Sequence, residues 1–442
     1  MVTTPGRLAV SGPRALPVSS SSHTRPPATF ALLSTMTRRN AIPFLALVVA
    51  LFIVTSFYSG LRTSDTWRDL PQHVGLGEHV DSAANADPSK DTPSDPDYAN
   101  WNPKLVFTPG SPMPPGHNYT STLVIARTKD ENIDWIREKM PDQELAVYVA
   151  DDPSAPLHPP KNKGHEVMIY LSYIIDHYDN LPDVSIFMHA HQLAWHNDLL
   201  LGSDAHQLVN RLSLPHVWRK GYVNMRCSWD PGCPDWQHPG ETVKNEYKQE
   251  EVLLAKSWSE LFPLDEIPEV LAQPCCAQFA ISRERIQAKP YAQYVWYRDW
   301  MFNTQIPDSL SGRVWEYVWQ YVFTGQNVLC PKEHMCYCEQ YGFCFGGEEE
   351  YDNFIALQNE LAENQSNYQD WENQRVEAEQ AAKEGLKSVE PPEPGKDAHY
   401  IKEIERLEPI IERLIHDAQV RGLDPKNRAL EAGREWKEGD GF

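Results

Sequence analysis

The feature that most constrains the fold is a predicted helix followed at once by a predicted buried strand, within residues 161–198. Between residues 167 and 178, apolar side chains recur three and four positions apart, which predicts one apolar helix face. The sequence Asp-Asn-Leu-Pro at 179–182 ends the helix, and the apolar run 184–188 is typical of a strand. Polar residues follow this strand directly. Because ligands of open α/β sheets bind outside the carboxyl ends of strands, we expect the functional site there.

Two further strands are predicted before this unit. Residues 122–127 and 145–150 are short apolar runs, separated by a short helix around residues 133–136. This alternation predicts an α/β domain with a mostly parallel sheet flanked by helices. The carboxyl ends of its three strands should then meet, as at a nucleotide or sugar site. The polar residues at these ends are Arg127 with Lys129, Asp130 and Glu131, Asp151 with Asp152, and His189 with His191.

A predicted membrane anchor precedes this domain. Residues 40–61 are uncharged and almost wholly apolar, and a helix of that length spans about 33 Å, enough to cross a bilayer. Residues 1–40 contain five arginines and no acid, which places them in the cytoplasm. We predict a cytoplasmic basic tail at 1–40, a transmembrane signal anchor at 41–60 and a disordered stem at 61–116. A cleaved signal peptide is the alternative, and translation from Met36 would give a more compact anchor.

All eight cysteines lie beyond the predicted anchor. An even number of cysteines in an oxidising lumen indicates disulfides, and glycosylation sequons begin at Asn118 and Asn364. We therefore expect a single-pass type II protein with its domain in the lumen of the endoplasmic reticulum or Golgi. Cys275 and Cys276 are adjacent, and we expect them to pair with other cysteines rather than with each other.

The net charge of −22 argues against nucleic-acid binding, which requires a basic surface. Much of the acidic excess lies after residue 347, where two helical patterns flank the proline-rich stretch 391–394. We predict a globular α/β domain at 117–347 and an acidic helical C-terminal region at 348–442. The helices of this region could bind a protein partner.

His189, His191 and His196 form the candidate metal site. Residues two apart on a strand point to the same side, so the first two imidazoles could hold one divalent ion such as Mn or Zn. Asp151 or Asp198 would complete the ligand set. Alternatively, the three histidines form hydrogen bonds in a polar pocket or bind a ligand directly. The sequence contains no complete zinc motif such as H-E-x-x-H.

The start of the predicted helix, KNKGHE at 161–166, could bind an anion because free N–H groups and the helix dipole favour negative charge. Lys161 and Lys163 are the candidate phosphate ligands there. Further along, RVWEYVWQYVF at 313–323 predicts one buried helix, with a stacking surface for sugars as the alternative. Glu316 lies among its aromatic residues, where burial would raise the pKa of the carboxyl and suit it to act as a general base.

Several stretches of residues 117–347 resemble a fungal family of single-pass membrane proteins with a domain of unknown function. They include LVIARTKDENIDWI, KNKGHEVMIYLSYIIDHYDNLPDVSIFMHAHQLAWHND and SGRVWEYVWQYVFTG. The order of elements is more loosely similar to that of glycosyltransferase-A-fold proteins. In this comparison Asn162, Gly164 and Glu166 match the N-x-G-x-E that opens a helix. CAQF at 276–279 and the Trp-Glu pair ending at Glu316 stand where such enzymes place an acceptor loop and a late carboxylate.

The resemblance to that fold breaks at the third strand, where the expected D-x-D reads His189-Ala-His191. It implies that histidines replace the metal-binding acids, or that the site works without metal, or that the protein is no longer a transferase.

The leading hypothesis is a luminal glycosyltransferase-like enzyme that uses a nucleotide sugar and a glycan acceptor. The alternatives are a non-catalytic glycan-binding or scaffold protein and a metal-dependent hydrolase. Asp151 and Asp152 could also form only a turn before Pro153. The candidate catalytic residues are Glu166, Asp198 and Glu316. The candidate substrate-binding residues are Arg127, Asp151, Asp152, Lys161, Lys163, Trp195 and Asn197, and the candidate metal ligands are His189, His191 and His196.

Overall fold

The computed structural model describes residues 107–438 except 112, 115 and 386–388. These residues belong to one compact unit, Ala99–Phe442. The predicted tail at 1–40, the predicted anchor at 41–60 and most of the predicted stem lie outside the described residues. Among the residues that are described, no helix is both long enough and apolar enough to cross a membrane.

Five strands form one sheet in the order β2-β1-β3-β5-β4. Strands β1, β2 and β3 are parallel, whereas β5 pairs antiparallel with both β3 and β4. Four strands therefore run in the same direction, as predicted for a mostly parallel sheet. The strands are β1 (Ser121–Arg127), β2 (Glu144–Val149), β3 (Val184–His189), β4 (Tyr222–Asn224) and β5 (Phe279–Ser282).

Both faces of the sheet are buried, because successive side chains of a strand point to opposite sides. In β1, Val124 joins one core cluster while Leu123 and Ile125 join the other. In β3, Phe187 and Ile186 divide in the same way. This explains why the strands read as nearly continuous apolar runs in the sequence.

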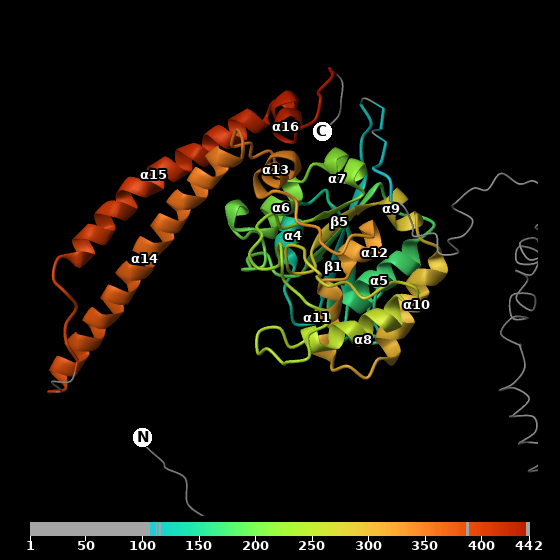
Figure 1. The fold of residues 1–442 in the computed structure, drawn as a ribbon, viewed down its shortest axis with the longest axis horizontal. Coiled ribbons are helices and arrows are strands. Elements are labelled where there is room, and N and C mark those ends of the chain that lie inside the picture. The colour runs from blue at the N-terminus through green and yellow to red at the C-terminus, as the bar shows by residue number, and fades with distance from the viewer. Residues whose placement is uncertain (1–106, 112, 115, 386–388, 439–442) are drawn as a thin grey trace, which may run out of the picture. The chain divides into compact units, whose positions relative to one another are not determined.

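Helices cover each face, and Figure 1 shows the sheet between them. The first core cluster contains residues of α5 (Glu166–His177), α8 (Glu251–Leu261), α9 (Arg283–Gln287), α10 (Tyr291–Asn303), α11 (Asp308–Glu316) and α12 (Trp319–Thr324). The second contains residues of α4 (Asp134–Lys139), η2 (Leu199–Leu201), α6 (Ala205–Arg211), α7 (Leu214–Lys220), α13 (Glu333–Cys336), η3 (Tyr337–Tyr341), α14 (Glu348–Lys383) and α15 (Lys396–Gly422).

The three predicted strands and the predicted helix at 167–178 are confirmed to within one residue at each end. The short helix predicted around 133–136 is also present and extends to Lys139. The prediction of one helix at 313–323 is wrong, because the chain leaves the helical conformation at Tyr317 and begins α12 at Trp319. Trp315 and Trp319 are nevertheless both fully buried. The apolar pattern could not reveal the break, since these indoles pack into the same core with or without it.

All eight cysteines form disulfides, as the even count predicted. The prediction that Cys275 and Cys276 avoid each other is wrong, because they form a disulfide together. Adjacent side chains point apart in extended backbone, but Cys276 and Ala277 have positive φ values of 91° and 50°, so this segment is not extended. The other pairs are Cys227–Cys336, Cys233–Cys330 and Cys338–Cys344.

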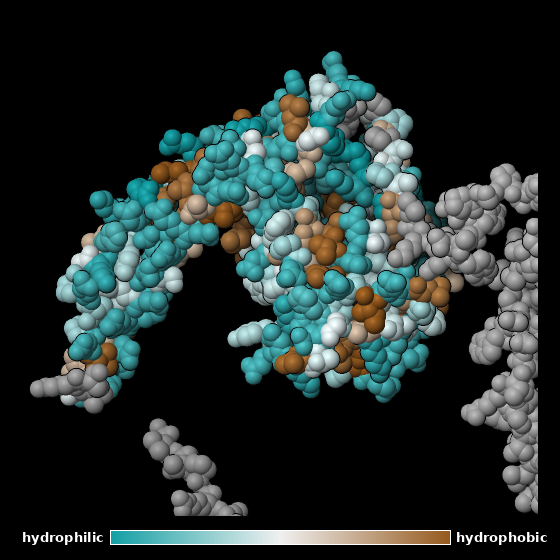
Figure 2. Space-filling view, in the orientation of Figure 1, coloured by the Kyte–Doolittle hydropathy of each residue, from teal (hydrophilic) through white to brown (hydrophobic). Residues whose placement is uncertain are grey.

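The C-terminal helices α14 and α15 lie side by side, on either side of the predicted proline-rich break (Figure 1). Their exposed surface is largely hydrophilic in Figure 2, in line with the acidic composition. The following helix, α16 (Pro425–Glu431), contacts the domain: Glu431 accepts hydrogen bonds from the backbone of Phe345 and Gly346. Nearby, Arg434 donates to buried Glu339 of η3 over 2.8 Å.

Candidate functional site

A cavity of about 290 Å³ lies at the carboxyl ends of β1, β2 and β3, where the sequence predicted the site. The start of α5 forms one wall and the loop after β3 forms another. Polar side chains at the predicted positions and at neighbouring ones surround it. The lining residues include Arg127, Glu131, Asn162, His165, Glu166, His189, His191 and His196.

Glu166 is the first residue of α5, and the turn before it determines where its carboxyl lies. Gly164 has a φ of 73°, and a Cβ at this position would overlap Met301 of α10. The Gly164 N–H donates to the carboxylate of Asp308, at the start of α11. A glycine is therefore required here both for backbone conformation and for space.

His189 and His196 form a hydrogen-bonded pair in the cavity. Nδ1 of His189 lies 3.0 Å from Nε2 of His196, and the rings meet edge to face. On the other side of its ring, His189 Nε2 lies 3.9 Å from the Glu166 carboxylate. Behind the pair, the Gln278 side chain accepts from the His189 N–H and donates to Asn197. These contacts fix the histidines against the start of β5.

Burial sets the protonation of this group. It raises the pKa of Glu166 to about 8, and the negative charges of Glu316 and Asp308 act in the same direction. Burial also lowers the pKa of His189 to about 3 and that of His196 to about 4, with other histidines adding to both shifts. At neutral pH the two imidazoles are therefore uncharged, and Glu166 changes its protonation state close to physiological pH.

Arg127 lines the cavity, and its guanidinium donates to the carbonyl oxygens of Thr128 and Lys129. Asp151 accepts from the Lys129 N–H, and Asp152 pairs with the Lys129 ammonium over 3.1 Å. Both carboxylates thus join the loop after β2 to the loop after β1. Asp152 also accepts from the backbone and hydroxyl of Ser154, which is the turn geometry that the sequence offered as an alternative.

Of the three candidate metal ligands, His189 and His196 contact each other, whereas His191 contacts Glu131. His191 is exposed and its Nε2 lies 3.5 Å from Glu131. In the described part of the chain, no set of ligand atoms that includes all three imidazoles lies within 4.8 Å of one another. Because the facing nitrogens of His189 and His196 bond to each other, a shared cation would require these rings to turn. The metal assignment therefore remains a prediction.

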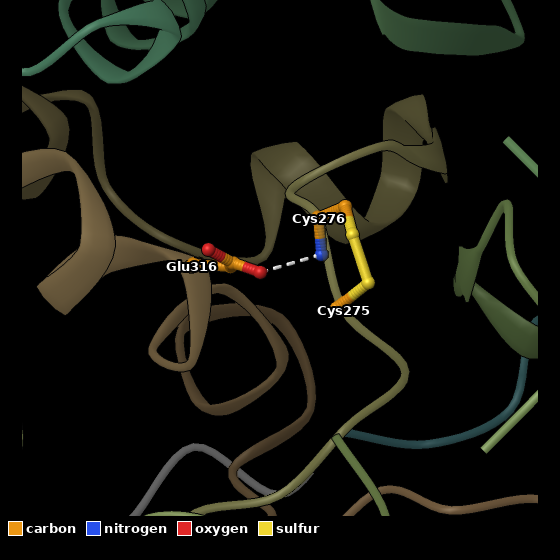
Figure 3. Close-up of side chains that lie close together, drawn as sticks. All are labelled: Cys275, Cys276 and Glu316. Atoms are coloured by element: carbon orange, nitrogen blue, oxygen red, sulfur yellow. Dashed lines mark hydrogen bonds between the residues drawn. A yellow bond between two sulfur atoms is a disulfide. The ribbon is translucent and has the colours of Figure 1, made fainter. Parts of the chain in front are cut away.

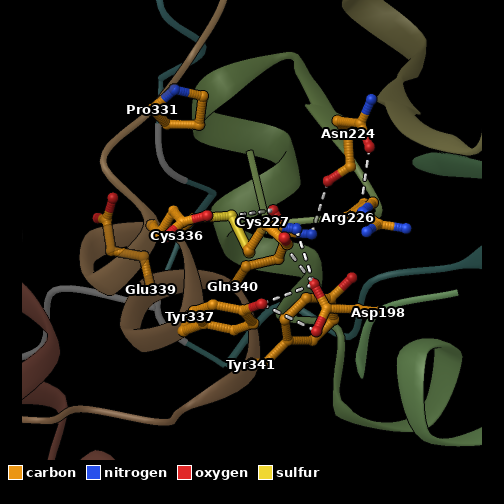
Figure 4. Close-up of a disulfide and its surroundings, with 12 residues drawn as sticks. Asp198, Asn224, Arg226, Cys227, Pro331, Cys336, Tyr337, Glu339, Gln340 and Tyr341 are labelled. Carbon is orange, nitrogen blue, oxygen red and sulfur yellow. Dashed lines mark hydrogen bonds between the residues drawn. A yellow bond between two sulfur atoms is a disulfide. The ribbon is translucent and has the colours of Figure 1, made fainter. Parts of the chain in front are cut away.

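Asp198 and Asn197 form hydrogen bonds that hold the loop after β3. The Asp198 carboxylate is fully buried and accepts from the backbone of Leu200 and Cys227 and from the Tyr337 hydroxyl (Figure 4). The Asn197 amide donates to two carbonyl oxygens of the loop. Neither side chain lines the cavity. The structure places both where they hold the loop in shape.

Three other predicted substrate-binding residues also lie apart from the cavity lining. The ammonium groups of Lys161 and Lys163 bond to the carbonyl oxygens of Phe302 and Thr304, at the end of α10. Trp195 is 70% exposed and meets the ring of His196 edge to face. Its indole is thus exposed beside His196.

Glu316 lies at the end of α11, beside the Cys275–Cys276 disulfide (Figure 3). Its carboxylate accepts from the Cys276 N–H over 2.7 Å. Burial raises the pKa of Glu316 to about 7, which agrees in direction with the sequence prediction. Glu316 is not among the residues lining the cavity, and it acts on Glu166 through its charge.

Four residues of this arrangement are absent from the candidate site residues named above, although Glu131 was expected near the strand ends. Asn162, His165 and Glu131 line the cavity, and Gln278 holds His189 in place. The KNKGHE stretch carried a signal for the first two, because both immediately precede the helix. Gln278 belongs to the CAQF stretch that the resemblance placed in an acceptor loop. It directly precedes β5, 89 positions beyond His189, and no local pattern predicts its contact with that histidine.

The fold and this cavity define a mixed α/β domain with an acid–imidazole site at the ends of its parallel strands. Residues 123–339 match the family described as "Protein of unknown function (DUF3431)". The chain therefore contains a DUF3431 domain, which agrees with the predicted domain of unknown function. Neither the curated proteins nor the solved structures contain a match to this chain.

Proposed function

We propose that the protein is a glycosyltransferase-like enzyme that moves a sugar from a nucleotide donor to a hydroxyl of a glycan. The observation that carries this proposal is the grouping of Glu166, His189 and His196 in one cavity at the strand ends, beside Arg127. Such a position is where open α/β sheets bind their ligands. The cavity combines a carboxyl that titrates near neutral pH, a neutral imidazole pair and a guanidinium.

In the proposed reaction, Glu166 as carboxylate takes the proton of the acceptor hydroxyl. The acceptor oxygen forms a bond to the anomeric carbon, and the bond from that carbon to the donor phosphate breaks. The nucleotide leaves as an anion, which the charge of Arg127 stabilises. The neutral pair of His189 and His196 has one N–H left after the hydrogen bond between the two rings, and this N–H is offered to the sugar. Relative to the sequence hypothesis, the base is Glu166 rather than Glu316 or Asp198, because Glu166 lines the cavity.

The proposal includes the predicted setting. We propose that the uncharged run at 41–60 anchors the protein as a single-pass type II membrane protein, with the domain in the lumen of the endoplasmic reticulum or Golgi. The eight cysteines in four disulfides fit an oxidising compartment. The acidic C-terminal helices are the proposed contact for a protein partner.

The test is nucleotide release by purified full-length protein, measured with a panel of nucleotide sugars and oligosaccharide acceptors, each with and without Mn. We expect release with at least one donor, and loss of release in Glu166→Gln and His189→Ala. Glu138→Gln is the matched control, because this carboxyl is exposed on α4, away from the cavity. The proposal is rejected if no donor is consumed in either condition.

A second candidate is a non-catalytic glycan-binding protein, and the exposed indole of Trp195 next to His196 favours it. Sugars bind to exposed aromatic rings through their apolar faces. In that case Glu166→Gln would bind glycans as the native protein does, while Trp195→Ala would not. A metal-dependent hydrolase is separated from both by metal analysis of protein purified without chelators, together with chelator treatment of any hydrolytic activity.

A further inference from the structure

A second groove, of about 580 Å³, lies between α8, α10 and the segment after α10. This volume is in the range of small-molecule sites. Its apolar wall is formed by Leu253, Trp296, Trp300, Ile306 and Pro307. No residue of this groove lines the cavity at the strand ends.

Helix α10 presents two parallel rows to this groove. Trp296 and Trp300 are four residues apart and therefore lie on one stripe of the helix, while Asp299 and Asn303 form a neighbouring stripe. Trp300 is nearly buried, and its indole N–H donates to Glu260 of α8 over 2.7 Å, so its ring is held in place. Trp296 is 52% exposed, so about half of this residue's surface is open to solvent.

The indole row and the polar row of α10 together favour one kind of ligand, a sugar. A pyranose ring has an apolar C–H face that packs on an indole and an edge of hydroxyls that bond to carboxylates and amides. The groove offers these two surfaces side by side. An anionic ligand is disfavoured, because the carboxyls of Asp299 and Glu260 line the groove and would repel it. Among the lining residues the one lysine is Lys256, and its ammonium, 3.8 Å from the Glu260 carboxylate, is already paired.

We propose that this groove is a carbohydrate-binding site that holds a short segment of a neutral oligosaccharide by stacking on Trp296. The site is separate from the cavity at the strand ends and does not depend on the proposed transfer reaction. Asp299 and Asn303 bond to the hydroxyls of the stacked sugar. The competing occupant is a basic peptide, which two carboxylates and an indole would also attract.

The experiment is a titration of purified full-length protein with hexasaccharides of glucose, of mannose and of N-acetylglucosamine, followed by tryptophan fluorescence and calorimetry. We expect at least one hexasaccharide to bind, and its affinity to fall roughly tenfold or more in Trp296→Ala. Trp296→Phe, which keeps an aromatic face, should retain most of the binding. Tyr247→Ala is the control, since this exposed aromatic residue lies outside the groove.

The inference is overturned if none of the hexasaccharides binds, or if Trp296→Ala binds as the native protein does. It is also overturned if an oligolysine peptide binds in the groove and sugars do not compete with it. Nucleotide release with a monosaccharide acceptor should be unchanged in Trp296→Ala. Loss of groove binding and loss of transfer are therefore separate results.

Discussion

Replacing Glu166 by glutamine should stabilise the protein while removing its activity. The Glu166 carboxyl has a pKa of about 8 in the folded protein, against an ordinary value of 4.5. Glutamine has nearly the shape of the protonated carboxyl and cannot ionise. The substitution therefore removes the free-energy cost of burying an ionisable group.

The size and sign of the effect follow from the two pKa values. Below about pH 4.5 the carboxyl is protonated in both states, so it does not affect the free energy of unfolding. As the pH rises from 4.5 to 8, the unfolded chain loses the proton while the folded protein keeps it, and stability falls by about 1.4 kcal/mol per pH unit. Glu166→Gln should thus gain about 3 kcal/mol at pH 7 and about 4 kcal/mol at pH 8.

The assay is denaturant unfolding at pH 5, 7 and 8, with a chelator present so that no cation binds the carboxylate. Glu138→Gln provides the baseline, because its exposed carboxyl should show no such pH dependence. An equal stability difference between native protein and Glu166→Gln at pH 5 and pH 8 would contradict a raised pKa of Glu166 in the folded protein. So would a destabilised variant at pH 8, since it would mean that Glu166 is ionised and paired in the folded protein.

Three other substitutions separate catalysis from stability. Asp198→Ala should lower the free energy of unfolding by about 3–6 kcal/mol, because several buried donors, including the Tyr337 hydroxyl, lose their acceptor; unchanged denaturant unfolding would contradict this role. Replacing Cys233 and Cys330 together by serine should cost about 3 kcal/mol, since the Cys227–Cys336 disulfide already joins the same two segments and the removed bond closes a further ring of only about a dozen residues; thermal unfolding measures the loss. His189→Ala should abolish nucleotide release and leave the melting temperature within a few degrees of the native value; retained release would exclude His189 from the reaction.

The sequence predicted the part of the fold that depends on local pattern. Strand β3 and helix α5 were recognisable because each has its own apolar periodicity and a clear break between them. Strand β4 has only three residues and β5 only four, and both take their place through pairing with distant segments. Such short strands have too few residues to show a period.

The candidate site was predicted in position but not in detail. Its location followed from the strand ends, and Glu166 and His189 were both named from the sequence. Their approach to 3.9 Å depends on how α5 packs on the sheet, which no spacing in the sequence records. Asp198 illustrates the opposite case: it is close in sequence to the histidines, but its donors come from segments up to 139 positions away, and these bury it.

The pairing of Cys275 with Cys276 has a consequence for the order of events during synthesis. Cys227 and Cys233 are made about a hundred residues before their partners, which corresponds to roughly 5–20 s on the ribosome. During this interval the next thiols to appear are those of Cys275 and Cys276. Because these two can oxidise with each other at once, they need not compete for the earlier cysteines. Once Cys275 and Cys276 have paired, the remaining six cysteines can pair in 15 ways instead of the 105 open to eight. The local disulfide therefore reduces the number of incorrect pairings that the long-range disulfides can form.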